Sequence, residues 1–291
     1  MPAGIIIIDK PDGWTSQDVA AKLRGVFRER RIGHGGTLDP MATGVLPIFV
    51  GRATRGVEFF ESAEKEYIAG LRLGVVTNTQ DTTGEVLEEH PVTVTRQQVE
   101  EALTGFLGKQ QQLPPMYSAV KIGGKKLYEL ARQGKTVERK PREIELLELE
   151  LLEGEGSEYR FRVRCSKGTY VRTLCHDLGA ALGCGGCMSS LRRTKAGCYT
   201  MEQAVTMEQL LAMEDPTSLL LPVESLFSDL PAVTVHENQL KAVYNGAAVR
   251  MKELPDGEYR VYAPDGTFLM VGKAEQGQIK TVKSFFEVSK P

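Results

Sequence analysis

The alternation of hydrophobic and polar residues along the chain predicts a mixture of strands and helices. Residues 4–8 form a short run of apolar side chains, which is typical of a buried strand. Thr15 and Asp18 have the spacing of a capping box, and the apolar residues after them recur every three or four positions, so a helix is expected to about residue 29. Further strands are expected near residues 67–73, 144–152 and 159–165, and further helices near residues 95–107, 170–182 and 207–213.

Pro47 interrupts another strand-like run, VLPIFVG at residues 45–51. A proline has no N–H to donate to a neighbouring strand, so within sheets it is confined to edges and irregular points. We therefore expect this strand to lie at an edge of its sheet or at an irregular point in it.

The last part of the chain has a different pattern from the rest. Pro222 and Pro231 mark a region with the character of a linker. Beyond it, residues 258–274 read as two strands around Asp265 and Gly266, a dipeptide that favours hairpin turns. The pattern predicts a large domain of mixed α and β structure over residues 1–230 and a small β-rich domain over residues 231–291.

The composition is that of an ordinary globular protein. Of the 291 residues, 41% are hydrophobic and 25% are charged, and the net charge of −2 argues against a protein that is basic all over. No apolar run approaches the ~20 residues of a membrane-spanning helix, and the first residues lack the basic segment of a secretion signal. The five cysteines are an odd number without framework spacing, so a cytoplasmic location is expected.

Charge is distributed unevenly along the chain. Residues 121–142 contain eight lysines or arginines against two glutamates, with a flexible pair at Gly123 and Gly124. The following residues, 143–158, contain seven glutamates and no basic side chain. This pattern fits a solvated helix face followed by an exposed strand, and it also fits a basic loop that grips RNA.

One carboxylate stands alone in the glycine-rich segment RIGHGGTLDPMATGVLPIF. Between residues 32 and 51 the only formal charge is Asp39, and His34 is the only other titratable side chain. Pro40 biases Asp39 towards an extended backbone, and apolar surroundings would raise the pKa of its carboxyl unless a cation faces it. Three interpretations remain open: a turn aspartate, a metal ligand, or a nucleophile or general base with a cation from elsewhere in the chain.

The candidate for that cation lies in CSKGTYVRTLCHDLG, residues 165–179. Arg172 falls in the first turn of the expected helix, where a positive charge opposes the helix dipole. The nearby pair Cys184 and Cys187, with Cys175 and His176 upstream, could suggest zinc. Because adjacent helix residues point apart, we expect no metal site there.

Six segments of the chain together resemble the TruB family of tRNA pseudouridine-55 synthases. They cover about residues 4–197, and the tail resembles the family's PUA-type RNA-binding domain more weakly. The segments are DKPDGWTS, GHGGTLDPMATGVLPI, KEYIAGLRLG, LPPMYSAVKIGGKKLYELARQG, CSKGTYVRTLCHDLG and LRRTKAG. The resemblance implies an α+β pseudouridine-synthase fold, with a mixed, largely antiparallel central sheet flanked by helices and loops, and a PUA-like tail.

The resemblance also implies roles for individual residues. Asp39 would be the catalytic nucleophile or base, Arg172 its ion-pair partner, and Tyr67 would pack against the target base and be placed for proton transfer. The residues implied on the substrate side are Tyr170 and Leu191 in the pocket, His34 at the displaced nucleotide, Lys10 supporting the active-site loop, and Asp81. The basic insertion at about 117–142 would grip RNA, and the implied backbone contacts are Lys121, Lys125, Lys126, Arg132 and Arg193.

The implied reaction exchanges an N–C glycosidic bond for a C–C bond at uracil C5. It needs no redox change, cofactor or metal, but the base must leave its stack. Asp39 could add to C6, attack C1′ or act as a base at C2′, and the sequence does not choose among these routes. The expected partner is the T-arm stem-loop of tRNA, bound by a monomer away from membranes. A non-catalytic RNA-binding or RNA-folding protein is the alternative, and it would not need Asp39.

Overall fold

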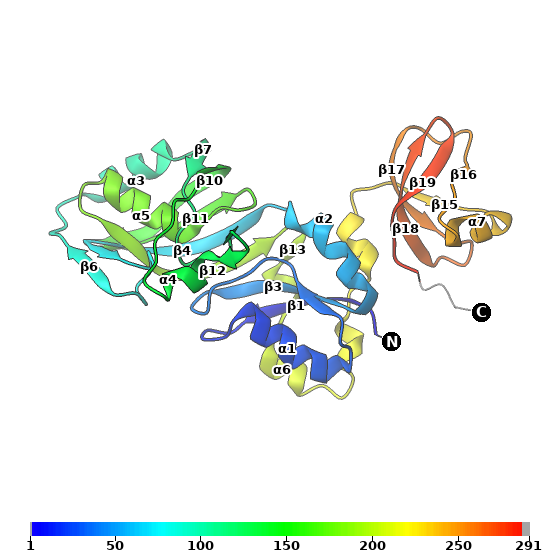
Figure 1. The fold of residues 1–291 in the computed structure, drawn as a ribbon, viewed down its shortest axis with the longest axis horizontal. Coiled ribbons are helices and arrows are strands. Elements are labelled where there is room, and N and C mark those ends of the chain that lie inside the picture. Colours follow the sequence, from blue (N-terminus) through cyan, green and yellow to red (C-terminus); the bar gives the residue numbers. More distant parts are fainter. Residues whose placement is uncertain (1, 287–291) are drawn as a thin grey trace.

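The computed structural model describes residues 2–286, and within them the chain is organised around two main β-sheets (Figure 1). The main path of the large sheet follows the order β14-β1-β3-β12-β4-β11-β10-β7, with β2 added beside β3 and β13 beside β12. Its strands are β1 (Gly4–Lys10), β2 (Ile32–His34), β3 (Thr43–Val50), β4 (Lys65–Leu73), β7 (Gly108–Gln112), β10 (Arg142–Glu155), β11 (Glu158–Cys165), β12 (Gly186–Ala196), β13 (Tyr199–Thr200) and β14 (Ala204–Thr206). The β1–β14 and β3–β12 pairs are parallel and the other pairs are antiparallel, so the sheet is mixed and largely antiparallel, as predicted.

Helices cover the large sheet near both of its ends. Figure 1 shows α1 (Ser16–Phe27) and α6 (Met207–Leu211) beside β1 and β3, and α3 (Arg96–Gly105) and α5 (Val171–Ala181) beside the β4–β11–β10 end. The predicted capping box of α1 is present, because the amide of Asp18 donates to the Thr15 hydroxyl at 3.0 Å and the Asp18 carboxylate accepts from the Thr15 amide. The shorter helical segments are η1 (Gly51–Gly56), α2 (Val57–Glu61), α4 (Leu127–Ala131), η2 (Met201–Gln203), η3 (Pro216–Leu219), η4 (Val223–Phe227), η5 (Glu237–Gln239) and α7 (Leu240–Tyr244).

Strand β3 is an interior strand of the sheet, so of the two positions expected for Pro47 the irregular point is the one observed. Strand β12 pairs with the first two residues of β3, Thr43 and Gly44. Strand β2 pairs with the other end of β3, from Ile48 to Val50. Pro47 lies between these two stretches of pairing, and its carbonyl accepts from the Gly35 amide at 2.8 Å. Pro47, which has no N–H to donate, therefore lies where the strand beside β3 changes from β12 to β2.

The smaller sheet contains the predicted hairpin. Its order is β15-β17-β18-β19-β16, and its strands are β15 (Ala232–Thr234), β16 (Val249–Arg250), β17 (Gly257–Tyr262), β18 (Phe268–Glu275) and β19 (Gln278–Ser284). Gly266, in the turn between β17 and β18, has a φ of 85°, which explains the glycine there. The Asp265 carboxylate accepts from the Thr267 amide at 2.9 Å and closes the turn.

The segment between Pro222 and Pro231 is a packed connection, which corrects the expectation of a linker. Phe227 of η4 is buried, with its ring 5.2 Å from Phe59 and 5.8 Å from Phe285. Buried side chains of the large sheet, of η4 and of the small sheet form one continuous hydrophobic cluster. The two sheets are therefore joined through an aromatic contact.

None of the helices within residues 2–286 has the length and apolar character needed to cross a membrane.

Candidate active site

Asp39 lies in the glycine-rich loop between β2 and β3. The loop is closely packed at Gly35, because a Cβ on this residue would come within 2.6 Å of the Phe60 ring. The Asp39 side chain keeps 35% of its surface exposed. The only acid between residues 32 and 51 is thus reachable from solvent although the loop around it is packed.

Arg172, at the start of α5, faces Asp39. Its Nε lies 2.9 Å from Oδ2 of Asp39, and its Nη2 donates to Oδ1 at 3.3 Å, which makes a two-point contact. The rest of the guanidinium donates to the carbonyls of Thr79 at 3.0 Å and Tyr117 at 2.8 Å. With only 6% of its side chain exposed, Arg172 is fixed in one orientation by groups from three parts of the chain.

Burial and charge act in opposite directions on the carboxyl of Asp39. Burial raises its pKa above the ordinary value, and the charge and hydrogen bond of Arg172 lower it. The nearby carboxylate of Asp81 raises it further. Arg172 therefore limits the rise that burial would cause alone.

Asp81 is an internal partner of Arg172, which corrects its expected place on the substrate side. Its side chain is 6% exposed, and Oδ2 lies 3.7 Å from Nη1 of Arg172. Its Oδ1 accepts from the Thr79 hydroxyl at 2.8 Å and from the Thr83 amide at 3.0 Å. A carboxylate so buried and so occupied supports the arginine and does not reach a substrate.

Tyr67 and Leu191 lie on neighbouring strands next to the loop. Tyr67 on β4 is directly opposite Arg193 on β12, and Leu191 is two positions earlier on β12, so both residues face the same side of the sheet. Burial raises the pKa of the Tyr67 hydroxyl, and the charge of Asp39 acts in the same direction. Tyr67 is therefore a protonated, buried hydroxyl within the electrostatic reach of Asp39.

Tyr170 and His34 are both half-buried. Tyr170 precedes α5, and the Gln112 side chain holds its backbone by accepting from the amide at 2.8 Å and donating to the carbonyl at 3.1 Å. His34 ends β2, and burial lowers its pKa, as does the charge of Arg193, so the ring is neutral at pH 7. Its buried Nδ1 has no hydrogen-bond partner within the described residues.

Lys10 and Arg193 are buried cations that bind the backbone of the loop. Lys10 donates to the carbonyl of Pro40 at 3.0 Å, in agreement with its expected support of the loop. Arg193 is only 1% exposed, and it donates to the carbonyls of Val45 at 2.7 Å and Gly36 at 3.2 Å. The expected contact of Arg193 with the RNA backbone is therefore wrong, because its guanidinium lies inside the protein.

The other predicted RNA contacts lie on a basic hairpin made of β8 (Lys121–Ile122), β9 (Lys125–Lys126) and α4. Lys121, Lys125 and Arg132 are exposed, Lys126 is half-buried, and none of the four forms an ion pair within residues 2–286. The segment that leads into this hairpin includes Tyr117, whose carbonyl binds Arg172. A positive surface without acidic partners among residues 2–286 is thus connected along the chain to the Asp39–Arg172 ion pair.

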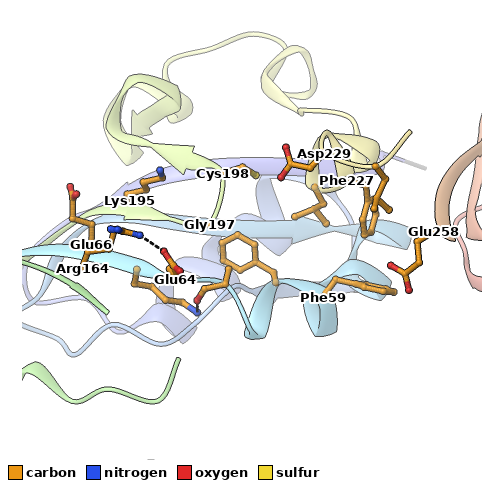
Figure 2. A pocket seen from close by; sticks show the side chains of 15 residues that line it. Phe59, Glu64, Glu66, Arg164, Lys195, Gly197, Cys198, Phe227, Asp229 and Glu258 are labelled. Carbon is orange, nitrogen blue, oxygen red and sulfur yellow. Dashed lines mark hydrogen bonds and ion pairs between the residues drawn. The ribbon is translucent and has the colours of Figure 1, made fainter. Parts of the chain in front are cut away.

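A cavity of about 450 Å³ lies elsewhere, between Phe60 and Phe227, and Figure 2 shows the Arg164–Glu64 ion pair at its margin. Neither Asp39 nor Arg172 lines this cavity, so cavity size does not locate the site. No group of three His, Cys, Asp or Glu side chains within the described part of the chain is arranged to hold a metal ion.

Comparison with known proteins accounts for nearly the whole chain. Residues 24–171 match the TruB family pseudouridylate synthase (N terminal domain), and residues 172–228 match the tRNA pseudouridylate synthase B C-terminal domain. Residues 231–282 match the family described as Pseudouridine synthase II TruB, C-terminal. The chain belongs to the TruB family. The resemblance read from the sequence motifs is thereby confirmed.

Two proteins named tRNA pseudouridine synthase B are similar to this chain over nearly their full length. The tRNA pseudouridine synthase B of Syntrophomonas wolfei is 46% identical over 286 residues, which cover 96% of each chain. That of Clostridium kluyveri is 39% identical, over 97% of this chain and 99% of its own. The similarity to these relatives therefore extends over both the large and the small sheet of this chain.

Solved structures similar to this TruB chain confirm its fold class. A chain of an H/ACA ribonucleoprotein bound to a substrate RNA containing 2′-deoxyuridine matches with a TM-score of 0.73 and 26% identity, over 98% of this chain and 85% of that one. A chain of a Cbf5-Nop10-Gar1 complex matches with the same TM-score of 0.73 and 30% identity, over 97% and 85%. The α+β fold with a C-terminal β-rich part is thus a known architecture.

Proposed function

We propose that this protein isomerises uridine to pseudouridine in tRNA, at position 55 of the T-loop. The observation that carries the proposal is the two-point contact between Arg172 and the partly exposed Asp39, the only formal charge between residues 32 and 51. The TruB relatives named tRNA pseudouridine synthase B support the same substrate. A non-catalytic RNA-binding role does not explain why a buried arginine orients this partly exposed carboxylate.

Asp39 is the group that reacts with the flipped nucleotide. Its carboxylate adds to C6, attacks C1′ or takes a proton at C2′, and each route requires the ionised form. Arg172 keeps the carboxyl ionised in a partly dry site and orients both oxygens. The bond between C1′ and N1 breaks, the base turns, and C1′ bonds to C5. C5 loses one proton and N1 gains one, so the nucleoside keeps its composition and oxidation level and the reaction consumes no cofactor.

Three other side chains shape the pocket for the base. Tyr67 offers a ring face for packing, and its protonated hydroxyl can donate to the turning base. Tyr170 and Leu191 complete the apolar walls. His34, as a neutral imidazole, fills the stack that the nucleotide has left.

The basic hairpin supplies binding to the RNA rather than chemistry. Lys121, Lys125 and Arg132 are exposed and have no acidic partner within the described residues, so they are available to the phosphates of the T-arm stem-loop. We assign catalysis to residues 1–230 and additional RNA binding to residues 231–291, and we propose a monomer that works in the cytoplasm.

The decisive experiment uses a T-arm stem-loop RNA with tritium at uracil C5, because isomerisation releases that tritium and simple binding does not. Asp39→Asn keeps the size of the side chain and removes its charge. We expect this variant to fold and to bind RNA but to release no tritium, because the reacting carboxylate is gone.

Asp229→Asn is the matched control, because Asp229 is exposed and lies outside the site. It should release tritium at the wild-type rate. Turnover by Asp39→Asn within about tenfold of wild type would contradict the role of Asp39. Binding by the wild-type protein without any release would instead support the non-catalytic alternative.

A further inference from the structure

Asp39 sits in a stretch of chain that has no regular hydrogen-bond ladder. Residues 37–39 are neither helix nor strand, so the neighbours of Asp39 in the chain must be fixed in another way. On the C-terminal side, the carbonyl of Pro40 accepts from the Gly13 amide at 3.0 Å and from the Lys10 ammonium at 3.0 Å. On the N-terminal side the neighbour is Leu38, whose side chain is buried in the main core.

The backbone of Leu38 is bound by one hydroxyl, that of Ser16. The Leu38 amide donates to Oγ of Ser16 at 2.8 Å, and the same hydroxyl donates to the Leu38 carbonyl at the longer distance of 3.3 Å. Ser16 is only 1% exposed, so no water competes for these bonds. Within the described residues these are the hydrogen bonds observed for the Leu38 backbone.

Two adjacent hydroxyls at the start of α1 have separate tasks. Thr15 accepts from the Asp18 amide at 3.0 Å and donates to the Asp18 carboxylate at 2.6 Å, so it caps the helix. Ser16, the first residue of α1, takes no part in this cap, and its hydroxyl binds the loop 22 residues away. Since α1 buries Val19, Leu23 and Phe27 in the core, Ser16 is attached to a rigid support.

We infer that Ser16 is a positioning residue for the isomerisation: its hydroxyl fixes Leu38, and through Leu38 it sets the place of the Asp39 carboxylate. This inference rests on the proposed function. A carboxylate that must meet one atom of a flipped nucleotide, while held at two points by Arg172, has little tolerance for displacement of its backbone. Ser16 itself touches neither substrate nor the reacting atoms.

The test compares two single hydroxyl deletions, Ser16→Ala and Thr15→Ala, by tritium release and by thermal melting. Ser16→Ala frees the Leu38 backbone, so we expect kcat to fall by about tenfold or more while KM for the RNA stays within about twofold. Thr15→Ala removes a helix cap, so its melting temperature should fall while its kcat stays within about twofold of wild type.

A kcat of Ser16→Ala within about twofold of wild type would overturn the inference, and so would an equal loss of kcat in both variants, which would indicate general weakening of α1. If Ser16→Ala does not melt cooperatively, Ser16→Cys repeats the comparison, because a thiol is similar in shape but a weak hydrogen-bonding group. Wild-type kcat in that variant would also overturn the role of Ser16. Absence of tritium release by the wild-type protein would instead contradict the proposed function.

Discussion

The guanidinium of Arg172 donates hydrogen bonds to acceptors that lie far apart in the sequence. Two of its contacts go to the Asp39 carboxylate, and the others go to the carbonyls of Thr79 and Tyr117 and towards Asp81. A lysine offers one compact ammonium in place of this planar set of donors. The arrangement therefore depends on the shape of the side chain as well as on its charge.

Arg172→Lys should accordingly lower kcat by roughly 100-fold while the affinity for RNA changes little, because charge is kept but the two-point contact is lost. Single-turnover tritium release and filter binding separate the two effects. Arg164→Lys is the matched control, since Arg164 pairs with Glu64 and Glu148 away from Asp39. Loss of affinity with intact turnover at saturating RNA would show that Arg172 contacts phosphate.

The same variant should also change the dependence of kcat on pH. Asp39 acts as a carboxylate, so activity falls as pH decreases through its pKa, which burial raises above 3.8. A weaker cationic partner lets the pKa rise further, because less of the burial effect is opposed. The acidic limb of Arg172→Lys should therefore lie at higher pH than that of wild type, and a limb at lower pH would contradict this electrostatic role.

At the scale of elements, the parallel pair β3–β12 depends on a glycine. Gly44 has a φ of 99°, and a Cβ there would come within 2.2 Å of the Arg193 carbonyl oxygen. The two strands can approach only because that position has no side chain. This pair joins β3, the strand that follows the loop of Asp39, to β12, the strand that carries Leu191.

Gly44→Ala should lower the free energy of unfolding by roughly 3 kcal/mol or more, from backbone strain plus overlap with β12. Denaturant unfolding measures this directly. Gly156→Ala is the control, because Gly156 has a φ of 61° with open space around it, and it reports the backbone cost alone, about 1 kcal/mol. Equal losses in the two variants would show that close approach to β12 does not matter.

Elements with local signals could be predicted from the sequence, and elements defined by distant neighbours could not. Helix α1 and the β17–β18 hairpin carry a capping box and a turn dipeptide, so short windows predict them. Strand β12 has no such signal, because it ends in the largely polar run LRRTKA and pairs with β3 and β4, which lie far earlier in the sequence.

The candidate site divides in the same way. The motifs were enough to predict Asp39 and Arg172, whose geometry the structure then supplies. The buried place of Arg193 could not be predicted, because the carbonyls that accept from it belong to Gly36 and Val45, about 150 residues earlier (157 and 148). Ser16 was missed because a serine beside a capping threonine reads as part of the helix start.

At the scale of the whole molecule, the small sheet contributes aromatic packing and also carries exposed basic side chains. Phe268 of β18 and Phe285, just after β19, pack on Phe227, and Lys273 and Lys280 on the strands are exposed. Removing residues 231–291 therefore takes away two different contributions at once.

A chain ending at Leu230 should melt at a lower temperature, because Phe227 becomes exposed. Below that temperature it should still release tritium at saturating RNA, with a raised KM and a shallower salt dependence, because fewer phosphate contacts remain. Phe285→Ala in the full chain is the control, since it weakens the aromatic contact but keeps the lysines, so only its melting temperature should fall. A folded but inactive truncated chain would show that residues 231–291 help to assemble the active site.

The separation of Asp39 and Arg172 by 133 residues also has a consequence for the newly made protein. Ribosomes add about 5–20 residues per second, so the aspartate is synthesised roughly 7 to 27 s before its arginine. The pairing of β1 with β14 is delayed for longer still, because β14 begins at residue 204. Until then the nascent loop lacks its counter-charge and the sheet keeps an open edge, so this enzyme acquires its reactive carboxylate late, when most of its chain has left the ribosome.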